Sequence, residues 1–358
     1  MRIKKIMKKL VYSSTNKKMK KYFIIVLIAI CFNQAKAQLS VANYKIINKI
    51  SVTGDGGWDY LNMDVNIGRL FISHGNMVQV LDVKSQKIIG TINDTKGVHG
   101  IALAKNLNKG YISCGKDTSV TVFNLETYEF IDRIKVTGLN PDAILFDSVS
   151  NKIFTFNGRG SNATVIDAKT DKVINTIVLP GKPEFAVTDN HGMIYVNIED
   201  KSEIVEISTD DFKIKRSWSI APGVEPSGLA IDQLNHLLFS VCDNKLMVIS
   251  SIENGKVVTS APIGEGVDGV AYDPSLQRIY SSNGEGTLTI IQKNKLQFSV
   301  LKNLPTQIGA RTICINPETH YLYLPVADYD KAPAPTTENP HPRSPIKPGT
   351  FTILEIAP

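Results

Sequence analysis

The chain repeats one pattern of short strands every 40 to 43 residues, and this repeat constrains its fold more than any other feature. Equivalent residues begin seven successive steps, which are separated by 40, 43, 42, 43, 41 and 43 positions. Repeats of this length are typical of solenoids and propellers, in which each unit buries its apolar faces against its neighbours. The seven step-initial residues are Asp59, His99, Asp142, Glu184, Ser227, Asp268 and Arg311.

Each step contains four short segments in which apolar and polar residues alternate, with turn-forming residues between them. In the first step these segments are 60–64, 69–73, 78–83 and 87–92. Alternation with a period of two, rich in β-branched and aromatic residues, predicts β-strands, and four strands per repeat predict a propeller blade. We therefore expect an all-β, seven-bladed β-propeller of four-stranded antiparallel blades.

The two ends of the repeat region predict how the ring closes. Residues 45–50 resemble the outer strand of a blade, but no inner strands precede them. Residues 351–356 resemble a third strand, and no fourth strand follows them. We expect the N-terminal strand to complete the last blade, because this pairing removes exposed sheet edges. Residues 38–358 would then form a single domain.

The N-terminal region has the character of an export signal. The first 37 residues contain ten Lys or Arg and no acidic residue, followed within that region by the apolar stretch 23–32 and by Ala35-Lys36-Ala37. This order predicts a secretory signal peptide, 1–37, cut after Ala37. Its apolar stretch is too short to span a bilayer. We expect a periplasmic or secreted protein without stable membrane insertion after cleavage; Met19 is a second candidate translation start beside Met1.

Removal of the signal changes the charge balance of the chain. The full sequence has a net charge of +6, but cleavage leaves 30 basic against 34 acidic residues, a net charge of −4. Proteins that bind nucleic acid present a basic face, so no nucleic-acid partner is expected. The three cysteines beyond the signal, Cys114, Cys242 and Cys314, fall in blades that are not neighbours, which predicts free thiols rather than disulfides.

Strand direction predicts which face carries a site. Consecutive strands of a blade are antiparallel, so the starts of the first strands and the ends of the second strands lie on one face. We expect Glu199 at the end of one of these second strands. The side chains there differ from step to step, whereas a purely structural repeat could use one residue type throughout, and this diversity favours a ligand site. The residues expected to line it are Asp59, His74, His99, Asp142, Asn157, Arg159, Glu184, Asn197, Asp268, Asn283 and Arg311.

The last step contains an insertion, 326–350, where the other steps have a tight turn. It is rich in proline and carries His341, Arg343 and Lys347. By the same strand-direction argument it should emerge on the polar face. Long loops in compact domains are often functional lids, and a passive cap is the alternative.

No cofactor is certain from the sequence, and a divalent metal ion is the one that these residues would suit. His74, His99 and Glu184 together offer imidazole and carboxylate ligands. The alternative is that each histidine is hydrogen-bonded to a neighbouring carboxylate. The sequence contains no P-loop, dinucleotide-binding fingerprint, nucleophile elbow or Cys-x-x-Cys motif.

Several segments resemble a known family. Residues 162–177, the run 229–232 and the strand Tyr195-Val196-Asn197-Ile198 are similar to the repeats of the YncE-like, YVTN-repeat family of seven-bladed propellers. The resemblance covers essentially the whole chain after the signal. It implies an exported protein and favours binding or scaffolding over a defined reaction. It implies no catalytic residues.

Three functions remain open at this point. The first is a protein that binds a small polar ligand or a protein partner at the polar face. The alternative is a metal-dependent enzyme of the lactonase or lyase type that uses the His/carboxylate cluster on the same face. The third is a scaffold that binds protein partners through the rims of its blades.

Overall fold

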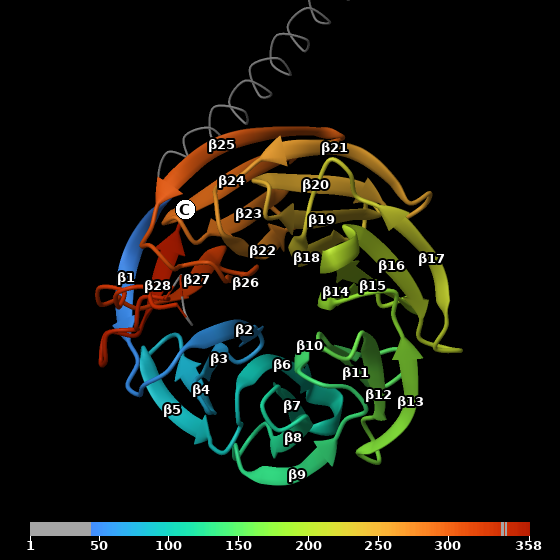
Figure 1. Cartoon of the computed structure of the whole chain (residues 1–358), viewed down its shortest axis with the longest axis horizontal. Coiled ribbons are helices and arrows are strands. Elements are labelled where there is room, and N and C mark those ends of the chain that lie inside the picture. Colours follow the sequence, from blue (N-terminus) through green and yellow to red (C-terminus); the bar gives the residue numbers. More distant parts are fainter. Residues whose placement is uncertain (1–43, 338–339, 341) are drawn as a thin grey trace, which may run out of the picture. The chain divides into compact units, whose positions relative to one another are not determined.

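The computed structural model describes residues 44–337, 340 and 342–358. Residues 46–357 form one compact unit, in which seven four-stranded antiparallel sheets are arranged around a common axis (Figure 1). The predicted signal peptide and His341 lie outside the described residues. The repeat pattern therefore predicted the fold class, the number of blades and the number of strands per blade, and the structure confirms all three.

The first three blades each use four consecutive strands, numbered from the propeller axis outward (Figure 1). A short 3₁₀ helix, Lys105–Leu107, follows the first strand of the second blade. The strands are β2 (Trp58–Asp64), β3 (Arg69–His74), β4 (Met77–Asp82) and β5 (Lys87–Ile92); β6 (Val98–Ala104), β7 (Lys109–Cys114), β8 (Ser119–Asn124) and β9 (Phe130–Lys135); and β10 (Pro141–Asp147), β11 (Lys152–Asn157), β12 (Asn162–Asp167) and β13 (Lys172–Val178).

Blades 4 to 6 follow the same order, with a second 3₁₀ helix, Glu199–Lys201, in blade 4. Their strands are β14 (Pro183–Thr188), β15 (Met193–Ile198), β16 (Glu203–Ser208) and β17 (Ile214–Ser219); β18 (Pro226–Asp232), β19 (Leu237–Cys242), β20 (Leu246–Ser251) and β21 (Lys256–Pro262); and β22 (Val267–Asp273), β23 (Arg278–Asn283), β24 (Thr287–Asn294) and β25 (Gln297–Pro305).

The last blade joins the two ends of the repeat region. It contains β26 (Cys314–Asn316), β27 (Tyr321–Val326) and β28 (Thr352–Ala357), and β1 (Lys45–Ser51) pairs beside β28 as its fourth strand. The backbone N–H of Val52 donates to the carbonyl of Phe351 at 3.0 Å, and Asn48 Nδ2 donates to Glu355 Oε2 at 2.5 Å. The predicted closure by the N-terminal strand is confirmed.

The core lies between adjacent blades. At the junction of the last and first blades, Trp58 and Leu70 pack in one cluster with Tyr323 and Ile353. Each large apolar side chain buried in this way stabilises the fold by about 1.5–3 kcal/mol. The alternation read from the sequence thus serves to bury both faces of each sheet against its neighbours.

The three cysteines after residue 43 are free thiols, as predicted. Cys114 and Cys242 are buried, and Cys314 is partly exposed. Among the described residues, no helix is long and apolar enough to cross a membrane.

Candidate functional site

The first strands of blades 1 to 6 share a β-bulge that shapes the site. In β2, Trp58 pairs with His74 and Leu61 pairs with Ile72, so Asp59 and Tyr60 together lie opposite Ser73. Such a bulge re-aims the side chains that it carries. Ser73 fixes it, because Ser73 Oγ accepts from the Asp59 N–H and donates to the Tyr60 carbonyl, both at 3.0 Å. The equivalent bulges carry His99, Asp142, Glu184, Ser227 and Asp268.

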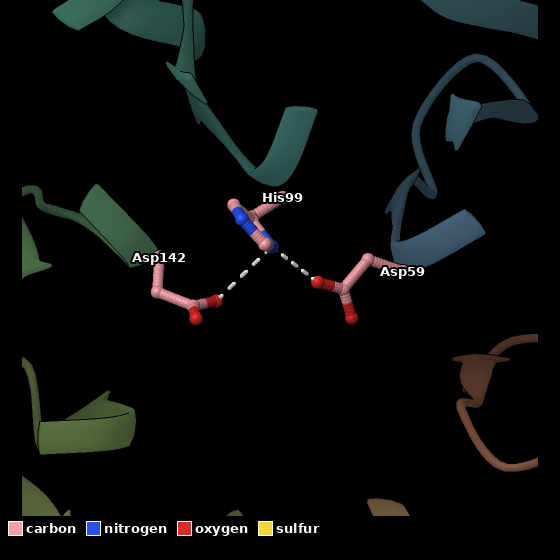
Figure 2. Close-up of side chains that lie close together, drawn as sticks. All are labelled: Asp59, His99 and Asp142. Carbon is pink, nitrogen blue, oxygen red and sulfur yellow. Dashed lines mark hydrogen bonds and ion pairs between the residues drawn. The ribbon is translucent and has the colours of Figure 1, made fainter. Parts of the chain in front are cut away.

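His99 lies between two carboxylates that come from the neighbouring blades. Its Nδ1 is 2.6 Å from Asp59 Oδ2 and 3.6 Å from Asp142 Oδ1 (Figure 2). One ligand-type atom from each of these three residues lies within 4.8 Å of the other two, which is close enough for a metal ion to bind all three. The three side chains are 27%, 18% and 13% exposed for His99, Asp59 and Asp142. We call these residues the central triad.

The charges around His99 keep its imidazole protonated. Burial alone would lower the pKa of His99, but the hydrogen bond to Asp59 and the charges of Asp142, Asp59 and Glu184 raise it to about 9. Nδ1–H therefore donates to Asp59 at neutral pH. A Cβ on Gly115 would come within 2.7 Å of His99 Nε2, so the absence of a side chain there makes room for the ring.

A second group of charges lies beside the triad. Lys182 Nζ contacts Glu199 and lies 3.1 Å from Glu184 Oε2. That oxygen is buried and has no hydrogen-bond partner of good geometry among the described residues. Burial and the nearby charge of Asp142 raise the pKa of Glu184 to about 8, while burial raises the pKa of Asp142 to about 7 despite the charge of His99.

Arg311 and Asp268 complete the ring of charged residues around the axis. Arg311 Nε donates to Asp268 Oδ2 at 2.7 Å, and the Arg311 side chain is 42% exposed. Burial and the charge of Asp59 raise the pKa of Asp268, and Arg311 opposes this effect. Arg311 thus uses one N–H on Asp268 and remains accessible to solvent.

Two aromatic side chains meet across the propeller axis next to these charges. Tyr60, the second residue of the β2 bulge, packs against Phe185, the second residue of the β14 bulge, with ring centroids 5.2 Å apart. Burial, followed by the charges of Asp142, Asp59, Glu184 and Asp268, raises the pKa of Tyr60 well above its usual range. The phenol therefore lies close to carboxylates from four blades and stays neutral.

The structure brings together some of the predicted site residues and separates others. The step-initial residues converge, apart from Ser227, whose hydroxyl donates to the Val267 carbonyl at 3.2 Å. Four residues at the ends of second strands are instead fully buried, because the second strand lies one position farther from the axis. These four are His74, Asn157, Asn197 and Asn283.

His74 does not join His99 in a shared cluster. Its Nδ1 lies 2.8 Å from Gln79 Oε1, and its ring stacks on Phe351 at 4.2 Å. Gln79 Nε2 donates to the Thr53 carbonyl, which turns Oε1 toward His74 and places the imidazole proton on Nδ1. The structure therefore does not assemble the predicted set His74, His99 and Glu184; Asp59 and Asp142 surround His99 instead.

The buried asparagines hold turns and bulges. Asn197 Nδ2 donates to the Ser227 and Gly228 carbonyls, at 2.9 and 3.2 Å, and so supports the bulge of the next blade. Asn157 donates to Asn162 and Thr164, and Asn283 to Thr287 and Thr289. Arg159 is exposed.

Sequence reasoning missed Tyr60, Phe185 and Lys182. The alternation of a regular strand would turn Tyr60 away from the side occupied by Asp59, and only the bulge gives both side chains access to the axis. A serine on the second strand, Ser73 and again Ser113, is the sequence feature that could have predicted the bulge. Ser113 Oγ accepts from the Gly100 N–H at 2.8 Å, as Ser73 does in the first blade.

The insertion of the last blade lies at the rim of this face. Tyr329 and Ile346 form an isolated antiparallel bridge, and the Tyr329 ring lies 6.2 Å from that of Trp58. In the view down the axis the ribbon of this segment lies over the last blade and does not cross the centre of the ring (Figure 1). The described part of the insertion therefore borders the charged cluster without covering it.

Comparisons with known proteins show the fold. No protein-family model matches the sequence, and no curated protein is recognisably similar to it. Among solved structures, Kuenenia stuttgartiensis hydrazine synthase is 16% identical, with a TM-score of 0.69 over 76% of this chain and 94% of that chain. U3-55K is 9% identical, with a TM-score of 0.73 over 88% and 99%. The WD40 repeats of RRP9 are 8% identical, with a TM-score of 0.72 over 88% and 98%. The chain thus has the seven-bladed, WD40-like propeller fold.

Proposed function

We propose that this chain is an exported, YncE-like propeller that binds a small polar ligand with a positively charged group at the charged cluster, without a defined reaction. The observation that carries the proposal is the imbalance of charge around the axis. Five carboxylates, those of Asp59, Asp142, Glu184, Glu199 and Asp268, face three basic side chains, those of His99, Lys182 and Arg311.

The protonation of the carboxylates supports a cationic ligand. Burial is the main cause of the raised pKa values of Asp142 and Glu184, and the charges of nearby carboxylates raise them further. A bound ammonium group would supply the missing positive charge. It would replace the protons that Asp142 and Glu184 carry in the free protein. Glu184 Oε2, whose one charged neighbour among the described residues is Lys182 at 3.1 Å, offers it an acceptor.

Arg311 supports a second, anionic group on the same ligand. The Arg311 side chain is 42% exposed, and its Nε–H donates to Asp268. The remaining N–H groups of the guanidinium can bind a carboxylate or phosphate in bidentate fashion. A small zwitterion satisfies both parts of the cluster. A protein partner that inserts a basic side chain is the alternative ligand of the same charge.

A metal-dependent enzyme of the lactonase or lyase type is the second candidate, and the central triad favours it. The mutual distances within 4.8 Å would allow Asp59, His99 and Asp142 to hold a divalent ion. Binding would require His99 to lose the proton that its neighbours stabilise. We rank this candidate second because His99 Nδ1 is already hydrogen-bonded to Asp59.

Export is proposed from the sequence alone. The basic region, the apolar stretch and Ala35-Lys36-Ala37 predict cleavage after Ala37 and a periplasmic or secreted location. N-terminal sequencing of the protein recovered from an extracellular or periplasmic fraction tests both statements. A protein that keeps residues 1–37 inside the cell would contradict them.

Calorimetric titration tests the binding proposal. The mature chain is titrated with a panel of small amines and amino acids, beside Asp142→Asn, Glu184→Gln and the control Glu318→Gln, an exposed acid in a turn of the opposite face. We expect saturable binding of a cationic or zwitterionic compound, weakened about tenfold or more in the first two variants and unchanged in the control. Equal affinity in all three variants, or no binding by any compound, would overturn the proposal.

Elemental analysis separates the two candidates. Protein purified without chelator is compared with Asp59→Asn and His99→Ala. Near-stoichiometric metal that is lost in both variants would favour the enzyme. Metal-free protein that binds a zwitterion would favour the binding function.

A further inference from the structure

An open cavity of about 320 Å³, lined by residues of five of the seven blades, lies beyond the Tyr60–Phe185 pair. Its lining includes Asn62 and Met63, which follow Tyr60 along β2, and Val187, which follows Phe185 along β14. The first strands run from the charged face toward the opposite face, so the cavity lies beyond the aromatic pair and opens to solvent there. It is therefore separate from the charged cluster.

The wall of this cavity combines apolar side chains with polar backbone groups. Nine of the twelve lining residues, from five blades, are apolar, but Met63, Leu229, Ala230 and Ala271 are buried and present mainly their backbone to the cavity. A volume of this size lies in the range of small-molecule sites, which are mostly apolar with a few polar groups. Because the cavity is open to solvent, a ligand bound there would displace water from the apolar side chains.

The two polar side chains in the lining already have partners. Asn62 Nδ2 donates to the Ile101 carbonyl at 2.7 Å, and the Tyr272 hydroxyl donates to Asp232 Oδ2 at 2.8 Å. No charged side chain lines the cavity in the described part of the chain. An ionic ligand would therefore lose its hydration without gaining a counter-charge.

The backbone adds a limited capacity for hydrogen bonds. In each blade the first strand pairs on one side only, with the second strand, so its other edge faces the axis. Edges of this kind carry N–H and C=O groups without a ladder partner. A ligand with one or two polar atoms could use them, while its hydrocarbon part contacts the side chains.

We propose that this cavity is a second binding site, for a small uncharged molecule that combines a hydrocarbon or aromatic part with one or two hydrogen-bonding atoms. The site does not depend on the function proposed for the charged cluster. The Tyr60–Phe185 contact separates the two sites along the axis, so each can be occupied without the other.

Cys314 provides a reporter inside the cavity. It belongs to the lining and is partly exposed, whereas Cys114 and Cys242 are fully buried. Burial raises the pKa of the Cys314 thiol to about 12, so its alkylation should be slow, and a ligand in the cavity should slow it further.

Fluorescence titration of the mature chain with N-phenyl-1-naphthylamine, an uncharged aromatic dye, tests the proposal. Val270→Trp and Ile313→Trp each enlarge a partly exposed lining residue; Val149→Trp is the control, in an exposed turn of the same face. We expect saturable binding that the control retains and that both filled variants weaken about tenfold or more. No saturable binding, or undiminished binding in both filled variants, would overturn the proposal.

Alkylation of the unsubstituted chain tests the same proposal if Val270→Trp and Ile313→Trp fold poorly. Mass spectrometry follows modification of Cys314 by N-ethylmaleimide with and without the dye, and Cys314→Ser identifies the labelled position. We expect the dye to slow the modification of Cys314 in proportion to its occupancy. Modification at the same rate under saturating dye would contradict a ligand in this cavity.

Discussion

The rings of Tyr60 and Phe185, which belong to the first and fourth blades, contact each other across the propeller axis at a centroid distance of 5.2 Å. Both residues occupy the second position of a bulge whose first position carries an acid, Asp59 or Glu184. The contact therefore links two distant blades and divides the axis into a charged half and an apolar half.

The aromatic contact should contribute measurably to stability. We expect Tyr60→Ala and Phe185→Ala each to lower the free energy of unfolding by about 1–3 kcal/mol, because each removes a large side chain from a partly buried contact. Urea denaturation of both single variants and the double variant gives the coupling energy, which should be about 1 kcal/mol. Tyr60→Phe, the control, should lose much less; a coupling energy of zero would contradict a direct contact.

Stability should fall as pH rises from about 6.5 to about 9. The folded protein raises the pKa of His99 from 6.5 to about 9, so the stabilisation of the imidazolium is fully present below pH 6.5 and is lost as pH rises through 9. The raised pKa values of Asp142 and Glu184 act in the same direction, because ionisation of these acids is less favourable in the folded state; their loss begins above pH 3.8 and 4.5 and ends near pH 7 and pH 8, so only its last part falls in this range. We expect a total loss of about 2–5 kcal/mol over this range.

The contribution of His99 can be separated by substitution. Above pH 8 most of the remaining slope belongs to His99, so His99→Gln should flatten the curve there. His191→Gln, in an exposed turn, should keep the slope of the unsubstituted protein. Urea unfolding at half-unit pH intervals measures all three curves, and an unchanged slope in His99→Gln would show that another group titrates.

Two equivalent glycines provide a paired test of the position of His99. Gly115 and Gly158 each follow the end of a second strand, but a Cβ on Gly115 would lie 2.7 Å from His99 Nε2, whereas the nearest atom to a Cβ on Gly158 is 3.6 Å away. We expect Gly115→Ala to displace the imidazole from Asp59 and to lower its pKa from about 9. NMR titration of the His99 ring measures the shift, and Gly158→Ala should leave it unchanged.

The N-terminal strand should be needed for a closed ring. A chain that begins at Val52 lacks β1, so β28 becomes an unpaired edge. It also loses Ile50 from the core between the last and first blades. We expect this chain to be less stable and to associate through the free edge. Light scattering and thermal unfolding measure both effects, with a chain that begins at Tyr44 as the control; equal behaviour of the two chains would show that β1 is dispensable.

The sequence by itself determined the fold and its closure. Each of the seven steps of 40 to 43 residues contains its own alternating segments and turns. The pattern of each blade is therefore visible within one stretch of the sequence. The two ends also predict the closure. Residues 45–50 form an outer strand without a blade, and residues 351–356 end a blade that has only three strands, so the two segments complete one blade when they pair. The convergence of Asp59, His99, Asp142, Glu184, Asp268 and Arg311 on one face followed from strand direction alone.

The tertiary structure decided which of those residues interact and which are buried. Second strands lie away from the axis, so His74 packs on Phe351 and binds Gln79 instead of joining His99. The bulges of β2 and β14 give a second side chain access to the axis beside Asp59 and Glu184, which regular alternation does not predict, and so bring Tyr60 and Phe185 together. Partners and protonation states depend on distances across the ring, and these arise only when all seven blades close around the axis.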